Sequence, residues 1–366
     1  MGRAAYCLLI QVKEGIVIYQ ILATYGIGLI GALLFLVLHI PIPWILGPIT
    51  AVVLSKYLPC YRAATLPGAR DIAFTVLGVQ IGLTFTANTF SSIIPYLFPY
   101  TLLSSLMIGI SLLIGSYISK ITSIDKITAL VGSSPGGLSA MIAVSESLKG
   151  NSALVTIFHT LRLISVLCII PFYVVHGVTQ PDTAVNTEIA SISQEGEYWT
   201  IILYMICFLI GWKTRDRVPA SLVILPMLII GGLQPAGLSM YNLPEVVFLG
   251  AQLIIGSYLG QTISVNDLIK AGKTCIYFLT LATFVITLGI LFSYILSWWT
   301  GMARVTAVLA LAPGGLIEMA VTAEQANADP AIVSSLQTIR LLTIVVILPL
   351  LFKKFKSVRQ RVAEKD

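Results

Sequence analysis

Three charged side chains lie deep within apolar stretches of this chain, and they are the residues most suited to chemistry. Glu318 follows Gly314 by four positions, and Arg162 and Arg340 each lie well inside another apolar stretch. Ionisable groups inside a membrane are costly and mark pathways for ions or substrates. A carboxylate there can take up a proton or a cation, and an arginine can bind an anion. Both are therefore candidates for coupling and binding.

A Pro-Gly-Gly sequence interrupts two of the apolar stretches. Proline removes a backbone donor and glycine has low helix propensity, so we expect each helix to break at this point. Broken backbone at membrane depth must be buried in protein or line a wet cavity, which makes these segments candidate substrate-binding sites. The alternative is a tight helix crossing without a ligand. The residues concerned are Ser134, Pro135, Gly136 and Gly137 in the first stretch and Pro313, Gly314 and Gly315 in the second.

The two interrupted stretches belong to a duplicated unit. Thr128–Met141 is similar to Thr306–Met319, and Pro135 and Pro313 are 178 positions apart. The same offset relates most other shared features of the chain, including Arg162 and Arg340. The predicted organisation is a first membrane repeat at 15–175, an extracytoplasmic connector at 176–197, a second membrane repeat at 198–354 and a basic cytoplasmic tail at 355–366.

The acidic residues of the two copies differ. Glu318 would lie in the first turn of a half-helix, where the helix dipole stabilises a carboxylate, and we predict that it is the main coupling residue. Its counterpart in the first copy is Ala140, so the copies are not chemically equivalent. Glu146 and Glu324 occur in both copies but closer to the loops. They are further coupling candidates, with a solvated helix end as the equally weighted alternative.

The two arginines have three possible roles. Each lies about 16 Å along its helix, which is too deep for easy snorkelling. Each could pair with Glu146 or Glu324, cap the carbonyl end of a broken helix, or bind an anionic substrate directly. A polar pair on much the same face precedes each arginine: His159-Thr160 in the first copy and Gln337-Thr338 in the second.

The composition indicates that this chemistry takes place in a bilayer. Hydrophobic residues make up 57% and charged residues 10% of the 366 residues, and the mean hydropathy is +0.93. These values predict an all-α polytopic membrane protein with about five spans per copy plus one re-entrant or broken helix. The expected spans are Gly15–Leu38, Pro43–Leu58, Ile72–Phe90, Leu97–Ile118, Ser152–Val175, Tyr198–Gly211, Ala220–Ala236, Val246–Ile263, Cys275–Trp298 and Ala331–Leu351.

Loop charges favour inverted copies. Basic residues gather in the loops and tail that an inverted arrangement places inside, and the connector carries acidic residues without Lys or Arg. Both termini are then cytoplasmic, in a bacterial plasma membrane. Arg304 does not fit this pattern, and parallel copies with kinked but complete helices stay the alternative.

Simpler roles are expected for two other repeated features. Asn151 and Asp329 precede the final span of each copy and are predicted N-caps. The GxxxG spacings that begin at Gly78 and Gly256 favour close helix crossings.

The chain resembles the bacterial AbrB membrane family, which carries an AbrB duplication domain. The resemblance covers approximately Gly15 to Lys354, and its most specific parts are Ala312–Met319 and Gln337–Leu341. Members are often labelled ammonia monooxygenase or regulator of the aidB gene. The resemblance implies a membrane protein with a duplicated fold and implies no secure substrate.

Several function classes fit poorly. The only histidines, His39, His159 and His176, lie in separate segments without ligand spacing, so no metal, cofactor or oxygenase activity is expected. No nucleic-acid motif or nucleotide-binding loop is present. We therefore expect a gradient-coupled permease for a small organic anion or zwitterion. Its partners would be the lipid bilayer and that small-molecule or ion substrate. Assembly into a homo-oligomer is left open by the sequence. The alternative is a membrane sensor that affects gene expression indirectly.

Overall fold

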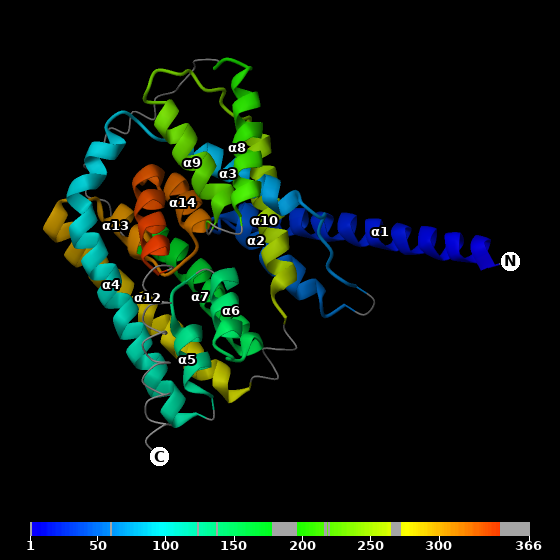
Figure 1. Ribbon diagram of the computed structural model, residues 1–366, viewed down its shortest axis with the longest axis horizontal. Helices are drawn as coiled ribbons and strands as arrows, with labels where there is room; N and C mark the ends of the chain where they lie inside the picture. The colour runs from blue at the N-terminus through cyan, green and yellow to red at the C-terminus, as the bar shows by residue number, and fades with distance from the viewer. Residues whose placement is uncertain are drawn as a thin grey trace. The chain divides into compact units, whose positions relative to one another are not determined.

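A computed structural model describes residues 2–58, 61–122, 124–136, 138–177, 196–215, 218, 220–264 and 272–344 (Figure 1). The predicted connector and basic tail fall largely or wholly outside these residues, as does Gly137. Within them the regular secondary structure is helical, apart from one isolated bridge between Glu197 and Met240. The helices are α1 (Gly2–Val37), α2 (Pro43–Ser55), α3 (Ala69–Leu83), α4 (Thr89–Ile121), α5 (Lys126–Ser133), α6 (Leu138–Ser147), α7 (Ser152–Gly177), α8 (Thr200–Thr214), α9 (Ser221–Leu233), α10 (Glu245–Thr262), α12 (Lys273–Thr300), α13 (Arg304–Leu311), α14 (Leu316–Gln325) and an unlabelled helix Pro330–Ile344.

The all-helical prediction is confirmed for the described residues. Each of the predicted apolar stretches overlaps a helix. Four helical segments there are long and apolar enough to cross a membrane, namely Val17–Val37, Thr89–Ile121, Ser152–Gly177 and Thr274–Thr300. The other apolar helices are shorter. The number of spans and the inversion of the copies stay predictions.

The sequence repeat is also a repeat of local structure. Helices α2 and α9 begin and end 178 positions apart, and the same holds for α5 with α13 and for α6 with α14. The helix at Pro330 likewise begins 178 positions after α7. Related residues in the two copies therefore form helices that begin and end at equivalent positions.

The compact units of the structure do not coincide with the two copies. One unit, called unit 1 here, contains α1, α2 and α3 of the first copy with α8, α9 and α10 of the second. Unit 2 contains α4 to α7 with α12, α13, α14 and the helix Pro330–Ile344. Each copy thus contributes its first helices to one unit and its remaining helices to the other.

Unit 1 is held by close helix crossings at glycines. Helix α3 packs against α9, and α10 packs against α2. A Cβ added at Gly78 would lie 2.5 Å from the carbonyl oxygen of Val223, and one at Gly256 would lie 2.6 Å from that of Ile45. Ile45 and Val223 are equivalent by the repeat offset, so each GxxxG motif crosses the other copy's helix. The predicted close crossings are confirmed.

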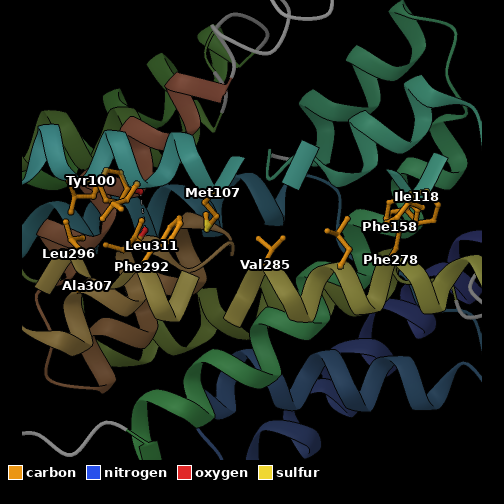
Figure 2. Close-up of a cluster of buried hydrophobic side chains, with 14 of the residues drawn as sticks. Tyr100, Met107, Ile118, Phe158, Phe278, Val285, Phe292, Leu296, Ala307 and Leu311 are labelled. Carbon is orange, nitrogen blue, oxygen red and sulfur yellow. Dashed lines mark hydrogen bonds between the residues drawn. The ribbon is translucent and has the colours of Figure 1, made fainter. Parts of the chain in front are cut away.

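Unit 2 has an apolar core between α4, α7, α12 and α13. Figure 2 shows Phe158 of α7 beside Phe278 of α12, and their ring centroids are 3.4 Å apart with nearly parallel planes. Tyr100, Met107, Phe292 and Leu311 belong to the same cluster, which has Ile93, Val285 and Leu296 among its other members. This core fixes α5 and α13, the helices that lead into the two Pro-Gly-Gly segments.

Candidate functional site

Both Pro-Gly-Gly segments interrupt a helix, as the sequence predicts. Helix α5 ends at Ser133 and α6 begins at Leu138, whereas α13 ends at Leu311 and α14 begins at Leu316. Both prolines, Pro135 and Pro313, are buried. A helix that ends inside the protein leaves its last carbonyl groups without intrahelical donors, so each break needs partners from elsewhere.

The arginines supply these partners, with matching geometry in the two copies. Arg162 donates from Nη1 to Ser134 O at 2.6 Å and from Nη2 to Gly136 O at 2.9 Å. Arg340 donates to the equivalent carbonyls, from Nη1 to Ala312 O at 2.6 Å and from Nη2 to Gly314 O at 2.9 Å. The planar guanidinium fork suits two acceptors held side by side. Of the three roles open to the arginines, carbonyl capping is the one that the structure displays.

One helical turn before each arginine, a second polar side chain reaches the same backbone. His159 Nε2 lies 3.2 Å from Val131 O. The equivalent residue Gln337 donates from Nε2 to Leu309 O at 2.8 Å and to Ala312 O at 3.2 Å, and its Oε1 accepts from Arg340. The sequence pattern identifies both residues only as polar neighbours of the arginines. Their shared offset was the signal that could have identified them as partners of the break.

Two further hydroxyl groups complete the carbonyl ends. Ser111 of α4 donates to Ser133 O at 2.6 Å, and Tyr100 of α4 donates to Ala310 O at 3.1 Å. The broken backbone is thereby supported by side chains from α4, α7 and the helix Pro330–Ile344. Such internal satisfaction is what the hydrocarbon region of a membrane requires.

The helices that carry the arginines begin at the predicted N-caps. Asn151 Oδ1 accepts from the N–H of Leu154 at 3.1 Å. Asp329 Oδ1 accepts from the N–H groups of Ala331 and Ile332 at 2.9 and 3.0 Å. Both caps are confirmed, and they fix the register from which each arginine reaches its break.

Glu318 lies in the first turn of α14 and is only 7% exposed. Its carboxylate lies against Gly315, where an added Cβ would collide with Glu318 Oε2. Gly315 is the N-cap residue of α14 and has no side-chain cap of its own. The carboxylate therefore lies at the positive end of the helix dipole, as expected. Glu146 and Glu324 are instead exposed near the C-terminal ends of α6 and α14, as the solvated-end interpretation expects, and their coupling role stays a prediction.

The two breaks are in contact with each other's final helix. Val166 of α7 packs with Met319 of α14, and a Cβ added at Gly314 would lie 2.8 Å from Val166 Cγ1. The equivalent Ile344 of the last described helix packs with Met141 of α6. Each final helix thus caps its own break and packs against the other one. Unit 2 therefore brings together all the described candidate residues of both copies.

The comparisons with known proteins agree on one family. The sequence model described as "Transition state regulatory protein AbrB" matches residues 44–356, which include both breaks and both arginines. The chain belongs to the AbrB family. It is 27% identical over 358 residues to "Uncharacterized protein YhjN" of Bacillus subtilis (strain 168), covering 88% of this chain and 90% of that protein. It is 28% identical over 324 residues to "Putative regulator AbrB" of Escherichia coli (strain K12), covering 85% and 89%.

The chemistry available to this AbrB-family chain lies in backbone and a few buried side chains. Among the side chains that the structure describes, no group of three or more His, Cys, Asp or Glu could hold a metal ion. The buried polar groups of unit 2 include Glu318, Arg340, His159, Gln337 and Ser134. These groups can bind ions, protons and small polar molecules.

Proposed function

We propose that the chain is a gradient-coupled secondary transporter that carries a small organic anion or zwitterion across the bacterial cytoplasmic membrane. The pair of broken helices in unit 2, each with its carbonyl end held by an arginine fork, is the observation that carries the proposal. Transporters with repeated folds place such breaks at their substrate sites, where half-helix ends face polar ligands. The four long apolar helices support a multi-pass membrane protein.

In this proposal the two copies have inverted topology. Each contributes about five spans and one re-entrant hairpin, both termini are cytoplasmic and the connector 176–197 is external. The charge distribution of the loops supports this orientation. In alternating access, the substrate site opens first to one side of the membrane and then to the other. Two equivalent broken helices of opposite orientation could exchange environments in this way.

The residues take different roles. The Pro-Gly-Gly backbone contacts the substrate, Arg162 and Arg340 hold that backbone in place and contribute positive charge, and Glu318 carries the coupling proton or sodium ion. Burial of Glu318 supports this assignment, because a carboxylate inside the membrane is costly without such a role. We propose no enzymatic reaction, no cofactor and no nucleic-acid partner.

A flux measurement with a matched control tests the proposal. Purified protein in proteoliposomes is exposed to acetate, lactate, glycine and glutamate under imposed proton or sodium gradients, and transport currents are recorded. We expect a current with at least one of these solutes. Glu318→Gln should abolish it at equal protein abundance, whereas Glu245→Gln, an exposed position in the first turn of α10, should retain it. Absence of any current, or full activity of Glu318→Gln, would contradict the coupling role.

Topology is tested by cysteine labelling in intact cells. Single cysteines at Ser139, Ile317 and Ala184 in a cysteine-free background are exposed to an impermeant reagent from outside; Ala184 and the Ser139 side chain lie outside the described structure. Labelling of Ala184 and Ile317 without Ser139 is expected for inverted hairpins. Equal labelling of cysteines at positions Ser139 and Ile317 would contradict the inverted arrangement of the two copies.

A regulatory membrane protein is the second candidate. The name of the Escherichia coli relative, which calls that protein a regulator, favours it. If the protein is a regulator, its effect on transcription should persist in the Glu318→Gln variant. If the effect instead depends on a transported solute, it should disappear together with the transport current.

A further inference from the structure

The two breaks differ in how many fully buried polar atoms lack a hydrogen-bond partner. At the first break, three buried atoms have no hydrogen-bond partner among the described residues: Ser134 Oγ, His159 Nδ1 and Arg162 Nε. The equivalent positions at the second break are Ala312, Gln337 and Arg340, and none of their atoms has this status. Buried polar atoms without partners are costly, and a native site normally supplies them with a ligand or water.

The three atoms come from the residue that follows α5 and from two residues of α7. Ser134 is fully buried and directly precedes Pro135. His159 is 3% exposed, and it contacts the carbonyl of Val131. Arg162 contacts the carbonyl of Ser134 itself. The unpartnered atoms therefore belong to groups that surround the end of α5.

Their chemistry defines what can bind. A carbonyl oxygen only accepts, so His159 Nε2 must carry the hydrogen that faces Val131 O. In the neutral ring Nδ1 is then an acceptor. Arg162 Nε–H is a donor, and the Ser134 hydroxyl can donate or accept. A carboxylic acid group matches this set, because its oxygens accept from arginine and serine and its O–H donates to the histidine.

We propose that the first break binds the carboxyl group of a small acid between Arg162 Nε–H and the Ser134 hydroxyl, with one proton shared between that group and His159 Nδ1. At the second break Gln337 and Arg340 donate to backbone carbonyls, and Glu318 already provides a carboxylate at α14. This inference rests on the proposed transport function and names the substrate class and the site. The proton arrives with the acid or from solvent and leaves with the acid, and no covalent bond to carbon changes.

Among the side chains that the structure describes on the elements packed against α7, the charged groups Asp125, Lys126, Glu146 and Arg304 are exposed. Glu318 and Arg340 are the buried ones, on the two helices of the second break.

Histidine nitrogen NMR tests the shared proton directly. The chain has three histidines, so the ¹⁵N signals of His159 in full-length protein are assigned by their loss in His159→Gln. At fixed pH in chloride we expect the tautomer protonated at Nε2 alone. Replacing chloride with acetate should move the Nδ1 signal toward the protonated position. Identical His159 signals in the two salts would overturn the proposal and would assign the site to water.

Acetate affinity, measured as the concentration dependence of the rise in unfolding temperature, tests the Ser134 hydroxyl. Ser134→Ala installs the residue of the second copy and should weaken acetate binding about tenfold or more, as expected for a lost hydrogen bond to a charged group. Ser145→Ala removes another buried serine with an unpartnered hydroxyl outside the break and should leave the affinity unchanged. Equal affinity in Ser134→Ala and the wild type would overturn the assignment.

The outcomes also separate this inference from the function on which it rests. If the protein gives transport currents but its His159 signals do not respond to acetate, the proposed carboxyl site is contradicted and the transport function is retained. If acetate binds at His159 but no solute gives a current, the transport function is contradicted and the carboxyl site is retained.

Discussion

Arg340→Lys tests whether the arginine fork holds the second break together. The substitution keeps the positive charge and removes the planar geometry, so it isolates the contribution of the paired contacts. Arg340 is 4% exposed and donates to Ala312 O and Gly314 O at 2.6 and 2.9 Å. A lysine ammonium can reach one of these carbonyls but cannot match the two-pronged arrangement.

The expected loss follows from one broken charge-assisted hydrogen bond. Such bonds contribute about 1.5–3 kcal/mol, and a carbonyl left buried without a donor accounts for part of that cost. We therefore expect Arg340→Lys to lower the free energy of unfolding by about 2 kcal/mol. Arg162→Lys should cost a similar amount, since its two distances are the same.

Unfolding in mixed detergent micelles by titration with sodium dodecyl sulfate measures this loss, with the five tryptophans as the fluorescence probe. Arg304→Lys is the matched control, because Arg304 is exposed and its guanidinium lies 5.9 Å from the centre of the Tyr294 ring. That variant should stay within about 0.5 kcal/mol of the wild type. If Arg340→Lys is no more destabilising than Arg304→Lys, the fork does not hold the break.

Two further substitutions test the packing and the capping that position the site. Gly47→Ala should lower the free energy of unfolding by about 1–3 kcal/mol, because a Cβ there collides with the backbone of Gly31. Gly26→Ala, where nothing lies within 4 Å of the added atom, should be neutral or stabilising in the same titration. Asp329→Ala should cost about 1 kcal/mol through loss of the N-cap of the helix Pro330–Ile344, and an unchanged unfolding midpoint would contradict the cap.

The sequence was sufficient to predict the local features that depend on residue type and spacing. Proline followed by two glycines predicts a helix break, Asn151 and Asp329 predict N-caps, and GxxxG predicts a close crossing. Each of these rules concerns a few neighbouring residues, and the structure agrees with each one. The duplication was equally accessible, because its offset is constant along the chain.

Features that depend on tertiary partners were not accessible in the same way. The sequence left three roles open for Arg162, and only the fold shows that Ser134 O and Gly136 O lie within its reach. The division into units that mix both copies was not predicted either, because hydrophobic pattern identifies helices without naming their neighbours. His159 was undervalued for the same reason, since a backbone carbonyl as partner leaves no signature in the sequence.

The comparison between the two copies separates the scaffold from the chemistry. The two arginines that hold the broken backbone have the same role and equal distances in both copies. This agreement is expected, because both breaks leave the same carbonyl groups to be satisfied. Ser134 and Ala312 differ although each backbone carbonyl accepts from its arginine, so this support does not require the serine hydroxyl. The same argument applies to Ala140 and Glu318, since one break is built without the carboxylate. Residues that differ at structurally equivalent places are therefore the ones on which ligand and coupling chemistry should be sought.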